Sequence, residues 1–163
     1  MKREIEFRGY DPDTKRWYYG SLVKQNKTTY VTSEDYDQNP SNTEWFILWD
    51  EMTDWCLPNR HLQGSVDPKS IGEYIGLHDK NGREIYEGDI VSFGSVWNNG
   101  DNEDIDEEFH IGVVEYDPNY AVYNVNCDES GEHRFMFTEV VNYDGFGVIG
   151  NIFENPELLE AKQ

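Results

Sequence analysis

The densest group of side chains that could do chemistry lies in the acidic tract from residue 98 to residue 108. Its carboxylates include Asp101, Glu103, Asp104 and Asp106. Carboxylate oxygens at this density can bind Ca²⁺ or Mg²⁺. The spacing of a calcium-binding EF-hand is missing, however, because no glycine occupies the sixth loop position counted from Asp101 or Asp104. These residues are therefore a candidate weak cation site, and an extended loop held open by charge repulsion is the favoured interpretation.

Side chains that could support catalysis or hold a cofactor do not occur in the patterns that such chemistry needs. The histidines and cysteines show neither zinc-site spacing nor a nucleophile motif, and the sequence contains no phosphate-binding loop. The run 145–150 matches G-x-G-x-x-G, but Pro156 follows too soon for the helix and second strand of a nucleotide site. We expect these glycines to let a curved strand turn a corner. The sequence thus predicts no enzyme, no catalytic residue, no metal and no cofactor.

The charge of the chain is strongly acidic and unevenly distributed. The formal net charge is −20, from 13 basic and 33 acidic residues. Residues 1–30 hold seven Lys or Arg against four acids, whereas residues 91–130 hold ten acids and no Lys or Arg. Contacts to phosphates require cations, so nucleic acid is not expected to bind the C-terminal part directly. The acidic surface is compatible with solubility alone, with a basic partner, or with imitation of nucleic acid.

The basic N-terminal part combines cations with aromatic rings. Arg16, Trp17, Tyr19 and Lys24 form a candidate platform on which the bases of a single-stranded nucleic acid could stack. Because successive residues of a strand point to opposite faces, at most Trp17 and Tyr19 of the run Trp17-Tyr18-Tyr19 can share one face. The favoured interpretation is that these rings supply part of the core. The same interpretation applies to three further rings, those of Trp45, Trp49 and Trp55.

Short apolar or β-branched runs, separated by turn residues, recur along the whole chain. This spacing is typical of a mainly β fold, either a barrel or a sandwich. A strand is predicted at 45–49 and a polar loop at 33–42, while the tract 50–63 shows no clear period. A short helix near the C-terminal end is predicted to have Asn155 as its N-cap and Pro156 at its first position.

The stretch 74–91, YIGLHDKNGREIYEGDIV, contains two turn signals. Asn81 and Gly82 tolerate the positive φ that a tight hairpin needs. Gly88 and Asp89 interrupt the alternation of the next strand, at a point where a bulge or bend would redirect the chain. We expect the Asp89 carboxylate to cap this bend by accepting backbone N–H groups, and not to act as an acid.

The same stretch carries a resemblance to a known family. Its run GL-x-DKNG-x-EIYEGDIV resembles the YopX-like family of phage and prophage proteins. The residues FRGYDPDTKRWYYG (7–20) and VIGNIFENPELLE (148–160) are similar to that family's opening hairpin and to its closing strand and helix. The resemblance implies a mostly β, phage-encoded protein of the host cytoplasm. It implies no established activity, cofactor or catalytic residue.

These observations predict a mainly β protein with two subdomains. The first is an N-terminal β-hairpin subdomain over residues 1–65. The second, over residues 66–163, is a small SH3-like barrel with the acidic loop 98–108 and the short C-terminal helix. The longest apolar runs are too short to span a membrane, and the basic N-terminal residues lack the apolar segment of a signal peptide. We therefore expect a cytoplasmic protein that does not contact membranes.

The function that these features favour is a non-enzymatic accessory protein that binds another macromolecule, a protein above all. Exposed strand edges would also permit homo-oligomers. Two alternatives stay open. The chain could be an acidic nucleic-acid mimic that inhibits a host DNA-binding enzyme, or it could bind single-stranded nucleic acid through the basic, aromatic N-terminal hairpin.

Overall fold

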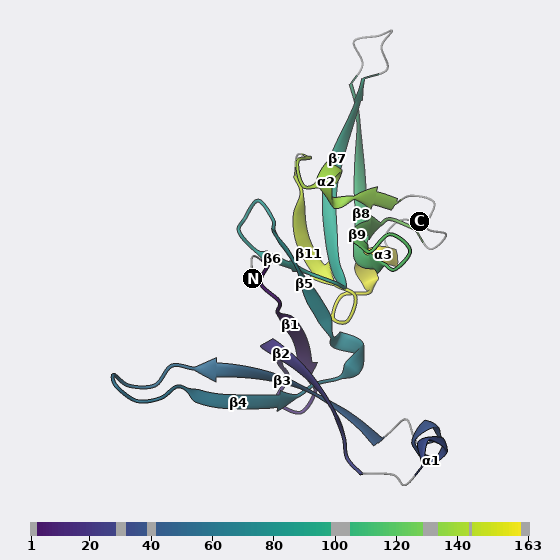
Figure 1. The fold of residues 1–163 in the computed structure, drawn as a ribbon. Helices are drawn as coiled ribbons and strands as arrows, with labels where there is room; N and C mark the ends of the chain where they lie inside the picture. Colours follow the sequence, from purple (N-terminus) through teal and green to yellow (C-terminus); the bar gives the residue numbers. More distant parts are fainter. Residues whose placement is uncertain are drawn as a thin grey trace. The chain divides into compact units, whose positions relative to one another are not determined.

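The computed structural model describes residues 3–28, 32–38, 42–98, 105–128, 134–143 and 145–160. Antiparallel strands dominate these ranges, which confirms the mainly β class. The chain divides into two compact units (Figure 1), unit 1 from Met1 to Glu73 and unit 2 from Tyr74 to Gln163. No helix in the described ranges is long and apolar enough to cross a membrane.

Unit 1 is built on an antiparallel sheet in the order β4-β3-β2-β1. Its strands are β1 (Phe7–Asp11), β2 (Arg16–Asn26), β3 (Thr43–Glu51) and β4 (Arg60–Ser65). The strand predicted at 45–49 is the central part of β3. Residues expected in a polar loop instead form the short helix α1 (Ser33–Asp37). This helix can start there because Thr32 Oγ1 accepts from the Asp35 N–H at 3.3 Å.

The connection after β4 belongs to unit 1, although the sequence suggested a division between residues 65 and 66. The Asp67 N–H donates to the Tyr10 carbonyl at 2.8 Å, and the Tyr10 N–H donates to Ser70 Oγ at 2.7 Å. Ser70 ends the 3₁₀ helix η2 (Pro68–Ser70). The first residues of β5 (Gly72–His78), Gly72 and Glu73, then pair with β1. These backbone bonds hold residues 66–73 on the sheet of unit 1.

Unit 2 contains a second antiparallel sheet, in the order β10-β9-β8-β7-β11. Its elements after β5 are β6 (Glu84–Tyr86), β7 (Asp89–Asn98), β8 (Ile105–Asp117), β9 (Val122–Asn126), β10 (Arg134–Met136), α2 (Phe137–Val140), β11 (Gly147–Asn151) and α3 (Glu157–Glu160). Among the described residues, the strand pairings do not join β10 to β11. The closed SH3-like barrel therefore stays a prediction, while the two antiparallel sheets are established.

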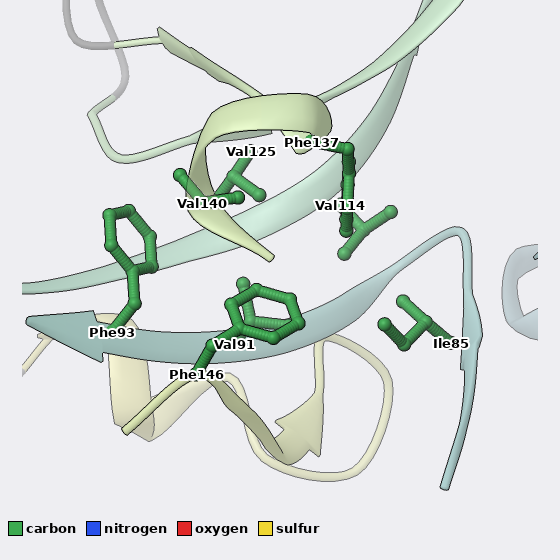
Figure 2. Close-up of a cluster of buried hydrophobic side chains, with 8 residues drawn as sticks. All are labelled: Ile85, Val91, Phe93, Val114, Val125, Phe137, Val140 and Phe146. Atoms are coloured by element: carbon green, nitrogen blue, oxygen red, sulfur yellow. The ribbon is translucent and has the colours of Figure 1, made fainter. Parts of the chain in front are cut away.

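One face of the second sheet carries the core of unit 2. Register places Val91 and Phe93 of β7 on the same face as Val114 of β8. Side chains from α2 and from the segment before β11 pack over this face (Figure 2). The complete buried cluster is Ile85, Val91, Phe93, Val114, Val125, Phe137, Val140 and Phe146. Burial of this apolar surface is the main stabilising contribution to unit 2.

The bend at Gly88 and Asp89 is a structural junction. The buried Asp89 carboxylate accepts the Tyr86 N–H through Oδ2 at 2.9 Å. Gly88 has a φ of 83°, which favours glycine. Its N–H donates to the Val114 carbonyl, and its carbonyl accepts the Ile152 N–H, both at 2.9 Å. The stretches 74–91 and 148–160, far apart in the sequence, thus meet at this bend.

Asp79 closes the hairpin between β5 and β6. Its Oδ1 accepts the N–H groups of Asn81 at 2.8 Å and Arg83 at 2.9 Å, and its Oδ2 accepts the Val148 N–H at 3.2 Å. Gly82 takes a φ of 81° in the same turn. Burial alone would raise the pKa of Asp79, but the backbone hydrogen bonds from Arg83, Val148 and Asn81 outweigh it and hold the pKa below its usual value.

The glycine-rich run 145–150 has a structural explanation. β11 pairs antiparallel with β7, and its register shifts between Val148 and Gly150, as at a β-bulge. A Cβ on Gly150 would lie 2.7 Å from Asn155 Oδ1, so a larger residue there would force the Asn155 side chain to shift. Asn155 Oδ1 accepts the Asn151 N–H at 3.4 Å, and the Asn155 carbonyl accepts the Leu158 N–H at 3.1 Å at the start of the predicted helix, α3 (Glu157–Glu160). This geometry is not that of a nucleotide-binding turn.

Candidate functional site

The sheet of unit 1 separates the residues that the sequence grouped as a candidate nucleic-acid platform. In the register of β1 and β2, Trp17 and Tyr19 share a face with Arg8 and Tyr10. Arg16 and Lys24 alternate with them and lie on the opposite face. The structure therefore brings the two aromatic rings together but places the two cations of the group behind them.

Trp17 and Tyr19 have different surroundings. The guanidinium of the buried Arg8 lies 5.0 Å from the centre of the Trp17 ring, and the Tyr10 ring meets the same indole edge-on at 5.5 Å. Trp17 is thereby half-buried inside a cation–π contact, which already occupies one face of the ring. Tyr19 is exposed. A base could stack on Tyr19 more readily than on Trp17.

The opposite face of the sheet is packed by its own aromatic rings. Tyr18 and Trp49 stack with ring centres 4.6 Å apart, and the Tyr18 ring lies over Gly64, where a Cβ would collide with it. Lys24 Nζ lies 5.3 Å from the centre of the Trp45 ring. Trp45 and Trp49 are half-buried by these contacts, in agreement with their interpretation as packing residues.

The tip of the β3–β4 hairpin carries three large apolar residues, of which Trp55 had been expected in the core. Trp55, interpreted as a core residue, is 96% exposed, so that interpretation is wrong. Met52 is 86% exposed and Leu57 62% exposed in the same loop. Singly exposed apolar residues are ordinary, but three large ones in one short loop form a candidate interaction surface. We call residues 52–59 the hairpin tip.

The hairpin tip has internal hydrogen bonds. Thr53 Oγ1 donates to the Pro58 carbonyl at 2.8 Å, and the Leu57 N–H donates to the Asp54 carbonyl at 3.1 Å. Cys56 takes a φ of 68°, in the left-handed region that non-glycine residues enter only in tight turns. These bonds close a turn that contains Trp55. The indole is thus displayed on a folded loop at the end of two paired strands.

The strands that support the hairpin tip contact each other through two cross-strand side-chain pairs. Arg60 and Glu51 lie opposite each other, with Nη2 and Oε2 2.7 Å apart. His61 and Asp50 are the next pair, with Nδ1 and Oδ1 2.6 Å apart. Asp54 is the one charged residue within the tip itself. The tip therefore carries a single charge, beside three exposed apolar side chains, on a chain of net charge −20.

The carboxylates proposed as a weak cation site cannot be placed. Asp101, Glu103 and Asp104 lie outside the described residues. Of Asp106, a residue of β8, only the backbone is described, and it pairs with Trp97 of β7. Within the described ranges, no cluster of His, Cys, Asp or Glu is arranged to hold a metal ion. The two cysteines, Cys56 and Cys127, are free thiols.

The buried carboxylate of unit 1 is a turn cap. Asp11 Oδ1 accepts the N–H groups of Asp13 at 2.9 Å and Thr14 at 3.4 Å, and its Oδ2 accepts the Thr14 hydroxyl at 2.9 Å. Burial would raise the pKa of Asp11, but these hydrogen bonds, with a further one from Tyr18, lower it below its usual value. A carboxylate that is ionised and accepts hydrogen bonds at both oxygens stabilises the turn and is poorly suited to act as a general acid.

This chain is similar to a known protein family and to a solved structure. A family model described as YopX protein matches residues 6–160, which include the strands of both units and the hairpin tip. Among solved structures, the crystal structure of protein EF1440 from Enterococcus faecalis is similar, at 23% sequence identity and a TM-score of 0.49. That match covers 97% of this chain and 99% of the other. No curated protein matches the chain.

Proposed function

The chain belongs to the YopX family, and from that premise we propose that it acts without catalysis, by binding another protein through the hairpin tip. The observation that supports this proposal is the exposure of Trp55 together with Met52 and Leu57 on one folded loop. Tryptophan is the residue type most often found at the energetic centre of protein interfaces. Trp55 is accordingly the proposed anchor, and the two neighbouring apolar side chains are the proposed surround.

The charge of the tip supports a protein partner over the alternatives. Phosphate recognition needs cations, and the one charge within residues 52–59 is the carboxylate of Asp54. The partner we propose presents an apolar pocket that takes up the indole. An accessory role in a phage life cycle is part of the same proposal. Binding by an acidic mimic would instead depend on the carboxylates of residues 91–130 and would weaken steeply with salt.

The test is affinity capture from a host-cell lysate with immobilised full-length chain. Three versions are compared: the natural chain, Trp55→Ala, and Tyr120→Ala as a matched control. Tyr120 is also an exposed aromatic residue, 78% exposed, but it lies in unit 2. Capture is measured at low salt and at about 1 M salt, where the Debye length falls to about 3 Å.

We expect a specific protein to be retained by the natural chain and by Tyr120→Ala at both salt concentrations. Trp55→Ala should weaken its binding by a factor of about 30 or more, since loss of a tryptophan anchor costs about 2 kcal/mol or more. Trp55→Ala should change the free energy of unfolding by no more than about 0.5 kcal/mol. Salt-sensitive capture that survives Trp55→Ala would refute the proposal and favour the acidic mimic.

A further inference from the structure

Strand β4 forms the outer edge of the sheet of unit 1. In the described part of the chain it pairs only with β3. The Val66 N–H, just beyond the strand, donates to the Trp45 carbonyl at 3.0 Å. Along an antiparallel strand, backbone groups point alternately toward and away from the neighbour. Counting back in the same register, Gly64 and Leu62 direct their N–H and C=O groups toward β3.

The intervening residues of β4 direct their backbone groups outward. These residues are His61, Gln63 and Ser65, and all three are exposed. They form an unpaired row of donors and acceptors along the edge, onto which another strand can add. This row is a second candidate binding surface, separate from the side chains of the hairpin tip.

Strand β4 lacks the features that usually protect an edge. Natural edge strands are guarded by lysine, proline, bulges or inward-pointing charges. The sequence of β4, RHLQGS, has no lysine, proline or acid, and its register with β3 runs without a shift. The charge of Arg60 is engaged by Glu51, and His61 contacts Asp50. The edge therefore has no bulge in its register with β3 and no lysine, proline or acidic residue.

The charge distribution over the chain favours a second copy of this protein as the occupant. Unit 1 has nine basic and thirteen acidic residues, 9 − 13 = −4, whereas unit 2 has four and twenty, 4 − 20 = −16. Two copies repel each other least when they approach through unit 1. The acid-free β4 edge lies in that unit.

The outward row is also complementary to itself. An antiparallel pairing centred on Gln63 sets this residue opposite its own counterpart and sets His61 opposite Ser65 of the second copy. Every outward N–H then meets an outward C=O. Leu62 faces the small Gly64, and the two Gln63 side-chain amides can hydrogen-bond to each other. No like charges face each other in this register.

We propose that β4 is a homotypic pairing edge, through which two copies join antiparallel about Gln63. Six residues per strand form a smaller interface than the standard protein–protein contact, so the dimer should be weak and dissociate on dilution. This inference goes beyond the proposed function because it does not involve the hairpin tip. One dimer would carry two tips, which would raise the avidity for a multivalent partner.

The test is sedimentation of the full chain over about 1 μM to 1 mM, the range in which a small interface associates. The natural chain should shift from monomer to dimer. Gln63→Pro should stay monomeric, because proline removes an outward N–H and leaves the bonds to β3 in place. Gln63→Ala keeps that N–H and should still dimerise, although somewhat more weakly. Circular dichroism and thermal melting check that each variant is folded.

Hydrogen exchange on the natural chain provides a readout that depends on no variant. The amides of His61, Gln63 and Ser65 should exchange more slowly as the concentration rises, while exposed amides elsewhere should not change. A monomer at every concentration, or a dimer that persists in folded Gln63→Pro, would overturn the proposal. Protection of these amides only after another protein is added would assign the edge to that protein instead.

The two proposals can fail separately. Trp55→Ala should dimerise as the natural chain does, because Trp55 lies outside β4. Gln63→Pro should still capture the partner of the hairpin tip, although with the lower avidity of a monomer. Loss of dimerisation in Trp55→Ala would contradict the β4 inference and would locate self-association at the tip.

Discussion

The two units of this protein organise their apolar residues differently. Unit 2 covers one face of its sheet with α2 and neighbouring segments and buries a compact cluster around Phe93. Unit 1 stacks rings such as Tyr18 and Trp49 along its own sheet and leaves Trp55 almost fully exposed. This contrast is consistent with different roles for the two units. Unit 2 has the features of a scaffold, and both proposed binding surfaces lie on the hairpin of β3 and β4.

The largest change in stability should come from removing a core ring from unit 2. Phe93→Ala deletes a fully buried side chain that contacts the rings of Phe135, Tyr143 and Phe146. We expect the free energy of unfolding to fall by about 3–5 kcal/mol, from lost burial and from the cavity left behind. Urea denaturation followed by circular dichroism measures the change.

The matched comparison for Phe93→Ala is Trp55→Ala, which removes a larger ring from unit 1. It should leave stability almost unchanged, because an exposed ring gains little from folding. Similar losses in the two variants would contradict the assignment of scaffold and binding surface.

A smaller effect is expected at the bend that joins the distant stretches of unit 2. Asp89→Ala leaves the N–H of the buried Tyr86 without its acceptor, at a cost of about 1–3 kcal/mol. Asp89→Asn keeps an oxygen at this position and should lose less. Thermal unfolding of the two variants beside the natural chain measures both changes. Equal stability of the natural chain and the two variants would show that the Asp89 carboxylate does not cap the bend.

The smallest effect should appear in the pH dependence of stability, and it should appear in both units. Asp11 in unit 1 and Asp79 in unit 2 both have a pKa below the usual value of 3.8. A lowered folded-state pKa contributes stability that is complete above the unfolded-state pKa, near 4, and is lost as the pH falls through the folded-state value. The natural chain should therefore lose stability as the pH is lowered from about 4.

Two variants separate the units in this acid test. Asp11→Asn and Asp79→Asn should each be less stable than the natural chain at neutral pH and should show a shallower loss below pH 4, near the usual carboxyl pKa of 3.8. Unfolding free energies measured from neutral pH down to about pH 2 cover the range in which carboxylates titrate. An unchanged pH dependence in either variant would show that its carboxylate is not held ionised by the fold.

Local patterns predicted much of the fold. The apolar run 45–49 predicted the centre of β3, because consecutive β-branched and aromatic residues favour a strand. Gly82 predicted a turn with positive φ, and Gly88 predicted a bend; both glycines take the positive φ that costs glycine least. Residues 33–37 were missed as a helix because the capping contact from Thr32 is one of many that a polar tract can make.

The candidate sites could not be predicted in the same way. The tract 50–63 has no period, so neither the pairing of Glu51 with Arg60 nor the exposure of Trp55 could be read from it. A tryptophan is buried in most folded proteins, and this expectation misplaced Trp55 in the core. A usable signal was present in the tip itself, MTDWCLPN, where an aspartate and a proline bracket apolar residues as in a turn.

The sequence by itself determined the mainly β class, the family, the charge asymmetry and the turn residues, because each depends on composition or on neighbours along the chain. The tertiary structure alone decided which face each ring occupies, which apolar residues stay exposed and which edge of β4 is unpaired. Those properties depend on register between distant strands. A shift of one residue would move every side chain to the other face, so the face of each ring is fixed only when the strands pair.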